Sequence, residues 1–329
     1  MADESIKLKA LQFVIGAVAK KDYEPSLCHL EIKGGRAVAY GGHIAMSTPV
    51  ACPFDVRPHA KSLVKAVQAC SNNDIGLNMT AGGKLTVKAN KFRAHIECLS
   101  SEVEFVQPAP AGEFFEVTSD FLTSLTTLAP FMSIDASRPW AQGLKIGQHS
   151  TYVTNNIILA QRWHGANFPR EVIIPADAVH ELIRIREEPL GIQFNEHSLT
   201  FYFEDKRWLL THLIAEDGGW GVADKIFDHN TAPDGLEEID DEIYEAIDIL
   251  KPFLEDRGLI YFKGDRLATS PNDEEGASLD TPVADGPIFH AEQFRSLKKI
   301  AKKINLSTYP KPCYFTGEML RGVIVGVRQ

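Results

Sequence analysis

Hydrophobic and polar residues alternate with a period of two along three well-separated stretches of the chain. These stretches turn at glycine or polar residues and are residues 30–47, 144–161 and 259–278. A second run of the same kind follows each of them, at residues 75–99, 190–214 and 304–327. Because period-two alternation is typical of half-buried β-strands, the pattern predicts three copies of a doubled strand–turn–strand unit.

Helical periodicity separates these strand runs. One helix is expected between the two strand runs of each copy, at residues 57–70, 175–185 and 290–304. Another helix is expected before each copy, at residues 5–21, 118–132 and 240–255. Each third of the chain then reads helix, strands, helix, strands, which predicts an internal threefold repeat. The predicted domains are residues 1–111, 112–228 and 229–329.

The two joins between the thirds are rich in proline or glycine, at residues 106–117 and 216–235. Such composition is typical of connections between domains. Two amphipathic helices packed on antiparallel sheets form an α+β unit. Three such units in a row predict an arc with helices along one face and sheets along the other.

The overall composition is that of a soluble globular protein, with 44% hydrophobic and 24% charged residues and a formal net charge of −10. No apolar run approaches membrane-spanning length, and the first residues lack the organisation of a signal peptide, so we expect a cytoplasmic protein. The five cysteines are far apart and form no C-x-x-C pair. They are expected to be free thiols and not disulfides or metal ligands.

The sequence carries no motif of a common catalytic or cofactor site. It lacks a P-loop, a dinucleotide-binding glycine motif, a nucleophile elbow and an H-E-x-x-H zinc motif. The eleven histidines are scattered, and none has a partner at metal-ligand or triad spacing. We therefore expect no enzyme activity, no cofactor and no metal, and an unrelated metabolic enzyme stays the weakest alternative.

One predicted helix gathers positive charge although the chain is acidic. Between Glu292 and Lys303 there are one acid and five bases, and apolar residues form a stripe on the other side of the helix. Such a face either meets solvent or attracts phosphate groups without reading base sequence. The five bases are Arg295, Lys298, Lys299, Lys302 and Lys303.

The threefold order and several stretches together resemble the β sliding clamp of bacterial replicative DNA polymerases. The stretches are EPSLCHLEI from residue 24, FPREVIIPADAVHELIRI at 168–185 and EDRGLIYFKGDRLATSPNDEEGA at 255–277. The divergence favours a phage-encoded member. The resemblance implies three clamp-type domains that form half of a ring, closed by a second copy around duplex DNA. It implies a processivity factor without catalysis, which tethers the DNA polymerase and is opened by a clamp loader.

The resemblance also implies positions for two sites. In the family's turn Thr-Asp-Gly-His-Arg-Leu, only the first and last residues match here, and the family's chain end is also altered, so the peptide specificity is expected to differ. The DNA-facing residues are expected to be Lys20, Lys21, Lys61, Lys65, Arg138, Arg184, Arg186 and the five bases named above. The apolar pocket for polymerase and loader peptides is expected at Thr154, Asn156, Ile157, Ile158, Leu159, Phe227, Val323, Val325, Gly326, Val327 and Arg328.

A head-to-tail homodimer is expected to join the edge strand 91–99, with Ala94 and Ile96, to Leu250 of the partner's third domain. One feature departs from the family. Residues 237–256 carry nine acids and one lysine, although the resemblance implies that this helix faces DNA. Either these acids pair with Lys298 and Lys302, or this part of the wall stands off from DNA. The second class of function is therefore a clamp-like binding or regulatory protein that does not encircle DNA.

Overall fold

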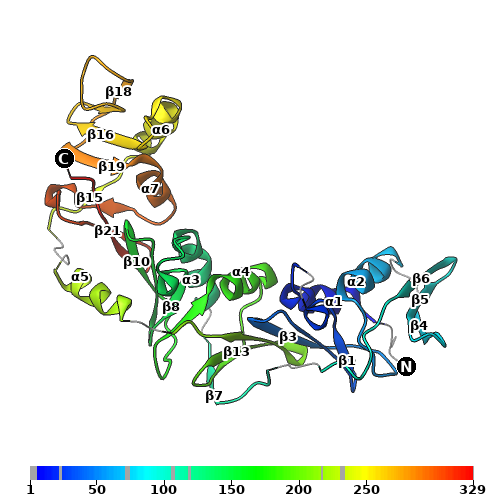
Figure 1. The fold of residues 1–329 in the computed structure, drawn as a ribbon. Coiled ribbons are helices and arrows are strands. Elements are labelled where there is room, and N and C mark those ends of the chain that lie inside the picture. The colour runs from blue at the N-terminus through cyan, green and yellow to red at the C-terminus, as the bar shows by residue number, and fades with distance from the viewer. Residues whose placement is uncertain are drawn as a thin grey trace. The chain divides into compact units, whose positions relative to one another are not determined.

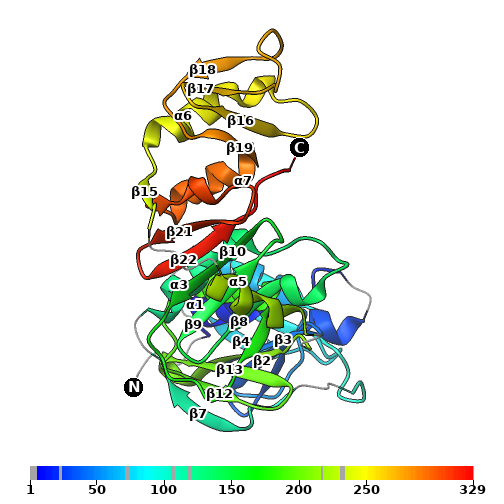
Figure 2. The same cartoon turned by 90° about the vertical axis from the view of Figure 1, so that its left-hand side faces the viewer.

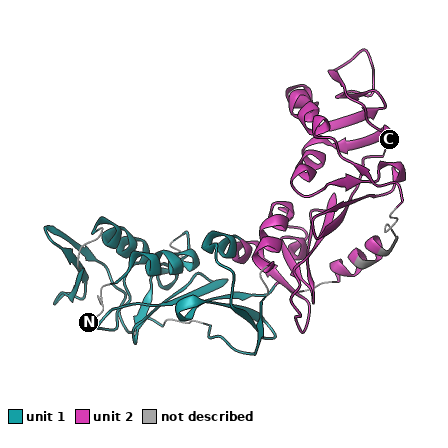
Figure 3. Ribbon diagram, turned by 180° about the vertical axis from the view of Figure 1, so that it is seen from behind, with its two compact units in different colours: residues 1–117, 180–213 teal, residues 118–179, 214–329 magenta. Residues whose placement is uncertain are grey.

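The structure is a computed structural model that describes residues 6–21, 24–70, 75–104, 108–117, 120–215, 218–229 and 234–328. The chain separates into two compact units, residues 1–117 with 180–213 (unit 1) and residues 118–179 with 214–329 (unit 2) (Figure 3). Among the described residues, no helix is both long enough and apolar enough to span a bilayer.

Unit 1 is built on a seven-stranded antiparallel sheet with the order β1-β2-β3-β14-β13-β12-β7. Strands from the first and second thirds of the chain meet where β3 pairs with β14, with Met46 opposite Leu209. The strand bounds are Glu31–Lys33 (β1), Arg36–Tyr40 (β2), Ile44–Pro49 (β3), Glu113–Glu116 (β7), Gly191–Phe194 (β12), Ser198–Phe203 (β13) and Arg207–His212 (β14).

The helices of unit 1 lie on one face of this sheet (Figure 1). They are α1 (Leu8–Val14), α2 (Ala60–Ala69) and the part of α4 (Ala176–Ile185) that falls in this unit. Buried apolar residues of α2 recur at helical spacing, and its exposed lysines lie between them. A three-stranded sheet of β4 (Gly76–Met79), β5 (Leu85–Ala89) and β6 (Phe92–Ile96) completes the unit.

Unit 2 has an eight-stranded sheet with the order β11-β8-β9-β10-β22-β21-β20-β15. Its strands are Gly143–Ile146 (β8), Ser150–Thr154 (β9), Ile158–Trp163 (β10), Val172–Pro175 (β11), Glu237–Glu238 (β15), Lys303–Ile304 (β20), Cys313–Gly317 (β21) and Leu320–Ile324 (β22). A four-stranded sheet has the order β18-β17-β16-β19. Its strands are Leu259–Lys263 (β16), Arg266–Ala268 (β17), Ser278–Asp280 (β18) and Asp285–His290 (β19).

Three helices of unit 2 lie on one side of its sheets: α3 (Phe121–Leu128), α6 (Asp241–Leu250) and α7 (Ala291–Ser296). A fourth, α5 (Ala223–His229), lies across the opposite face of the eight-stranded sheet (Figure 2). Short 3-10 turns precede α5 at Gly219–Val222 and follow α3, α6 and α7 at Ala129–Phe131, Lys251–Phe253 and Leu297–Lys299.

The predicted α+β class, with paired helices on antiparallel sheets, is confirmed. The helix predicted at 290–304 is wrong in its last turn, because helical structure ends at Lys299. Residues Lys303–Ile304 instead form β20, which pairs with β21, and Lys302 N donates to Thr316 O at 2.7 Å. The short helix α5 was not predicted, and the division into three domains stays a prediction.

Candidate apolar docking face and basic helix surface

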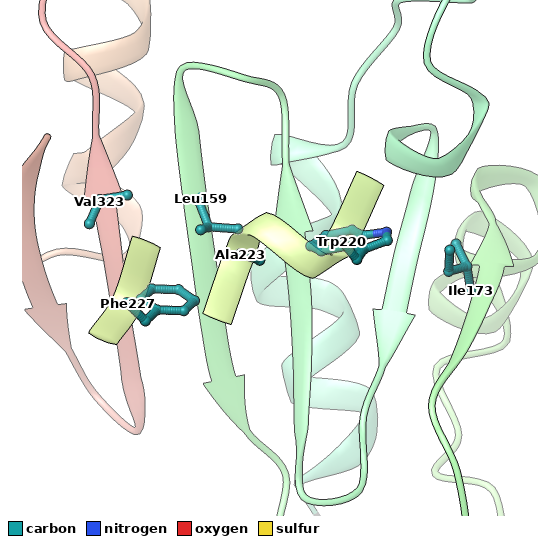
Figure 4. Close-up of a cluster of buried hydrophobic side chains, with 6 residues drawn as sticks. All are labelled: Leu159, Ile173, Trp220, Ala223, Phe227 and Val323. Atoms are coloured by element: carbon teal, nitrogen blue, oxygen red, sulfur yellow. The ribbon is translucent and has the colours of Figure 1, made fainter. Parts of the chain in front are cut away.

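An apolar cluster lies on the outer face of the eight-stranded sheet, away from α3. Leu159 of β10 and Val323 of β22 are direct partners in adjacent antiparallel strands, so their side chains share one face. Ile173 of β11 belongs to the same buried cluster. We call the sheet surface around these three residues the covered face. The chain's own residues 219–229, called here the cover segment, lie on it (Figure 4).

Trp220 is the first anchor of the cover segment and is 1% exposed. Its indole Nε1 donates a hydrogen bond to Trp140 O at 3.2 Å, and the two rings meet edge to face at 5.6 Å. Gly219 makes this approach possible, because a Cβ atom there would lie 2.3 Å from the Trp140 ring. The ammonium of buried Lys145 lies 5.8 Å from the Trp220 ring centroid and pairs with Glu171 at 2.6 Å.

Phe227 is the second anchor and is also 1% exposed. The guanidinium of Arg321 lies 4.7 Å from its ring centroid, within the range of a cation–π contact. Arg321 Nε donates to Gln161 at 2.6 Å, and Gln161 donates to the hydroxyl of Tyr152 at 2.9 Å. Tyr152 in turn lies between the two anchors, with its ring 6.4 Å from Trp220 and 6.5 Å from Phe227.

The apolar surface continues past the cover segment to Ile157 and Val325, which we call the open rim. Val325 is 40% exposed, Ile157 is half-buried, and Val325 N donates to Ile157 O at 2.8 Å. The turn beside them is held by Asn155, whose Oδ1 accepts from the backbone N–H groups of Ile157 and Ile158. The open rim therefore offers an accessible apolar edge next to a covered one.

The structure brings part of the predicted peptide pocket together. Leu159, Val323 and Phe227 meet in the covered face, and Ile157 and Val325 form the open rim. The remaining predicted residues lie elsewhere: Ile158 is fully buried on the other face of β10, Thr154 is buried with its hydroxyl bonded to Ile158 O, Asn156 is exposed in the turn, and Gly326, Val327 and Arg328 run toward Ile288 and Tyr309.

The basic residues near α7 are partly neutralised by the acidic helix α6. Arg295 forms a two-pronged pair with Asp248, with Nη2 and Oδ2 at 2.9 Å, and Lys298 Nζ lies 3.3 Å from Asp241. The hydrogen bond from Arg295 holds the pKa of the Asp248 carboxyl below its usual range. The predicted ion pair between these acids and Lys298 is thus found, and the second base that pairs with them is Arg295 and not Lys302. Lys302 lies instead 3.9 Å from Glu318.

Two further bases of this surface, Lys299 and Lys303, are exposed. Among the described residues, neither forms an ion pair. They are therefore the cations of this segment that remain available to an outside anion.

The predicted DNA-facing bases of unit 1 differ in how firmly they are held. Lys61 and Lys65 are exposed one turn apart on α2, and Lys61 Nζ donates to Lys20 O at 3.4 Å. Arg184 is engaged within the unit, since it donates to Gln12 O and Phe13 O at 3.1 and 2.9 Å and pairs with Glu181. The other three predicted bases, Lys21, Arg186 and Arg138 of unit 2, are exposed.

The residues predicted for the dimer interface are mostly inside the chain. Ile96 and Leu250 are each 2% exposed, and Ala94 is half-buried on β6, an edge strand of the three-stranded sheet. Two large apolar residues that sequence reasoning missed, Ile249 and Phe253, are 57% and 59% exposed at the end of α6. Their signal was an apolar pair four positions apart that lies outside the core stripe of this helix.

Among the described residues, no group of three or more His, Cys, Asp or Glu side chains is placed to hold a metal ion. Burial lowers the pKa of His164 to about 4, because this histidine lies between Phe121 and Phe168. His164 is therefore a neutral side chain at neutral pH and packs in the core of unit 2.

Neither a protein-family model nor a curated protein sequence matches the chain. Solved structures do match it. The Caulobacter crescentus pol III beta matches with a TM-score of 0.82 and 17% sequence identity. The Pseudomonas aeruginosa DNA polymerase III subunit beta matches with a TM-score of 0.79 and 17% identity, and the DNA polymerase sliding clamp of Bacillus subtilis with a TM-score of 0.78 and 15% identity. Each match covers 98% of this chain and 97% of the other. The chain therefore has the fold of the bacterial DNA polymerase III β sliding clamps over nearly its whole length.

Proposed function

We propose that the protein is a DNA sliding clamp, a non-enzymatic processivity factor whose two copies close a ring around duplex DNA. The observation that carries this proposal is the clamp fold, which extends over 98% of the chain. The low sequence identity to the solved clamps also supports our proposal of a divergent, phage-encoded member.

The charges on the helices support sequence-independent contact with duplex DNA. Exposed lysines on α2 and after α7 supply mobile positive charges, which attract phosphates without reading bases. The net charge of −10 then limits unwanted contact elsewhere on the protein. The acids of α6 do not cancel this attraction entirely, because Asp241 and Asp248 neutralise Lys298 and Arg295 but leave Lys299 and Lys303 without an acidic partner among the described residues.

A second copy is needed to close the ring under this proposal. The edge of β6 offers unpaired backbone groups, and an exposed strand edge is a ready site for pairing with another chain. Ile249 and Phe253 offer exposed apolar area that a dimer contact would bury. Ile96 and Leu250 would then support the interface from behind.

The polymerase and clamp loader are proposed to bind through short peptides at the open rim and the covered face. An apolar anchor residue entering such a surface typically supplies most of the affinity of a small interface. The accessible edge at Ile157 and Val325 supports this location.

Retention on DNA tests the proposed function directly. After loading, the protein is expected to stay on a closed circular duplex through gel filtration and to leave when the circle is cut by a restriction enzyme. A ring slides off a free end, whereas a protein bound to the DNA surface does not distinguish the two forms. Equal retention on circular and linear duplexes would contradict the proposal.

A clamp-like protein that does not encircle DNA is the second candidate. The ion pairs that tie the α6 acids to Arg295 and Lys298 favour it, because they remove part of the positive wall. Solution mass distinguishes the two candidates. A closed ring of this fold requires two chains, and a non-encircling binder requires only one.

A further inference from the structure

A cleft within unit 1 combines an excess of positive charge with an apolar lining. We propose that this cationic cleft binds an acidic peptide segment of a partner protein, with carboxylates at its basic rim and one apolar side chain inside it. The inference goes beyond the proposed function, because the cleft shares no residue with the covered face, the open rim or the bases expected to face DNA. It is therefore a second interaction surface on the same chain.

Three segments of unit 1 enclose the cationic cleft, which has a volume of about 590 Å³. They are the start of α1, the end of β3 with the residues that follow it, and the turn between β13 and β14. Ala10, Pro49 and Val50 supply apolar lining, and the sheet fixes this lining because Val50 N donates to Gly35 O at 2.9 Å. A space of this size accepts a few side chains of a ligand.

Positive charge exceeds negative charge around the cleft. Of the acids, Asp205 belongs to the lining, and Glu187 pairs with Arg207 and lies 3.6 Å from the ammonium of Lys9. Four bases against these two acids leave an excess of two positive charges, in a chain whose formal net charge is −10. Such a local excess attracts an acidic ligand to this part of the surface. The four bases are Lys7, Lys9, Lys206 and Arg207.

Three of the bases are available to an outside anion. Lys7 and Lys206 are exposed and form no ion pair among the described residues. Glu187 carries one negative charge and lies closer to Arg207 than to Lys9, so it cannot neutralise both. The side chain of Lys9 is 82% exposed and therefore keeps most of its charge for a ligand.

The turn between β13 and β14 holds Lys206 beside the cleft in an unusual backbone conformation. Asp205 and Lys206 have φ angles of 58° and 57°, in a region that residues with side chains seldom adopt. Arg36 of β2 stabilises this turn, because its Nη2 donates to Lys206 O at 2.9 Å. Backbone strain of this kind is concentrated at functional sites. Here it presents a lysine next to an apolar lining.

The combination of a basic rim and an apolar lining favours an acidic peptide over DNA. Phosphate groups of a duplex would meet the lysines but would bring no apolar group into the cleft. A peptide with an apolar residue between acids matches both parts, since that side chain enters beside Val50 while the carboxylates meet Lys7 and Lys206. Complementary charges of this kind speed association and select the partner.

The test uses a labelled model peptide. Fluorescein-labelled Asp-Glu-Leu-Glu-Asp is titrated with the full chain at low salt, and binding is followed by fluorescence anisotropy. The variant Lys7→Glu/Lys206→Glu is expected to bind at least about tenfold more weakly than the wild type, because like charges then face each other. The matched control Lys33→Glu/Lys88→Glu makes the same change of charge on exposed residues of β1 and β5 and is expected to bind as the wild type. Equal weakening by both variants would overturn the proposal.

Changes in the peptide test the two halves of the cleft without altering the protein. The neutral peptide Asn-Gln-Leu-Gln-Asn is expected not to bind, and Asp-Glu-Gly-Glu-Asp is expected to bind the wild type clearly more weakly than the leucine peptide. Equal affinity for the leucine and glycine peptides would mean that the apolar lining is not used, and the proposal would be wrong. Absence of binding of the leucine peptide by the wild type would also overturn it.

DNA is the competing occupant. Retention on circular duplex is expected to be the same for Lys7→Glu/Lys206→Glu and for the matched control. If the cleft variant alone loses retention while its affinity for the acidic peptide is unchanged, the cleft contacts phosphates and the proposal fails.

A second measurement needs no substitution and does not depend on the folding of a variant. In the wild type, saturating acidic peptide is expected to slow amide hydrogen exchange at residues 50–51 and 205–207, which line the cleft. Protection confined to other segments would place the peptide elsewhere and overturn the proposal.

Discussion

Releasing the basic segment from its acidic partners should make DNA binding stronger and more dependent on salt. The variant Asp241→Asn/Asp248→Asn removes the two carboxylates that hold Lys298 and Arg295. It raises the net charge from −10 to −8, since two negative charges are removed from each chain. Each freed cation that meets a phosphate adds roughly 0.9 to the slope of log affinity against log salt. The slope should therefore steepen by up to about 1.8 per chain.

The cost to folding should be small. The side chains of Lys298 and Asp241 are 46% and 74% exposed, and those of Arg295 and Asp248 are 42% and 45% exposed. Exposed ion pairs contribute about 0–1 kcal/mol each to the free energy of unfolding. The melting temperature should accordingly fall by only a few degrees. A large loss of stability would show that these pairs hold α6 in place.

The assay is DNA binding by the loaded ring over a range of salt concentrations, on circular duplexes of two unrelated base sequences. The matched control is Asp273→Asn/Glu274→Gln, which makes the same change of charge in the exposed turn between β17 and β18, where Asp273 pairs with Lys263 and Arg266. If the control steepens the slope equally, the effect is one of net charge, and the reasoning about the basic segment is refuted. A dependence on base sequence would refute it as well.

Removal of positive charge should have the opposite effect. Replacing the four lysines of this segment by Ala should flatten the salt slope, and Lys299→Ala/Lys303→Ala alone should account for up to about 1.8 of it per chain. These two residues have no acidic partner among the described residues, so their loss should hardly change stability. An unchanged slope would mean that this segment does not meet DNA. The four lysines are Lys298, Lys299, Lys302 and Lys303.

Three further outcomes are expected. Between pH 6.5 and about 4, His164 is protonated in the unfolded chain but neutral in the folded protein, so the free energy of unfolding should fall by up to about 3 kcal/mol as the pH is lowered. His164→Gln should flatten this pH dependence in thermal melts, whereas substitution of the exposed His197 by Gln should leave it unchanged. Arg207 holds the pKa of Glu187 below its usual range, so that contribution is present at neutral pH and lost in acid. Glu187→Gln removes the carboxylate partner of the buried Arg207, which keeps its hydrogen bond to Glu204 O, and should cost about 2 kcal/mol in denaturant titrations. The cost is less than for a fully buried pair because Glu187 is one-third exposed. Light scattering at micromolar concentration should give the mass of two chains, and the mass of one would contradict the ring.

Local periodicity was sufficient to place most strands and the core side of most helices. It failed at residues 300–304, where apolar spacing continues but the backbone joins a sheet. Gly317 explains this end, because a Cβ atom there would lie 1.9 Å from Ile300 O, so β21 approaches the chain closely at this point. Such a contact depends on a partner strand far along the sequence, and no local pattern reports it. The pairing of β3 with β14 was hidden for the same reason.

The sequence drew attention to two strand residues of the candidate site but not to the segment that lies on them. The turn before β10 and the strand β22 drew attention to Leu159 and Val323, and the structure puts them side by side. The cover was missed because Trp220 follows two glycines in a stretch that composition marks as a linker. Helix α5 is only seven residues long, and isolated helices of that length are marginal without tertiary packing. Its formation therefore depends on the sheet beneath it.

The order of strands in unit 2 has a consequence for synthesis on the ribosome. Strand β10 ends at Trp163, but the strand that pairs with its free edge, β22, begins only at Leu320. At about 5–20 residues per second, roughly 8–30 s of translation separate the two. During that interval the nascent chain presents an unpaired apolar edge, which is the kind of surface that chaperones bind. Partially synthesised chains should therefore be captured by such factors, and rare codons placed between the two strands should lower the yield of folded protein.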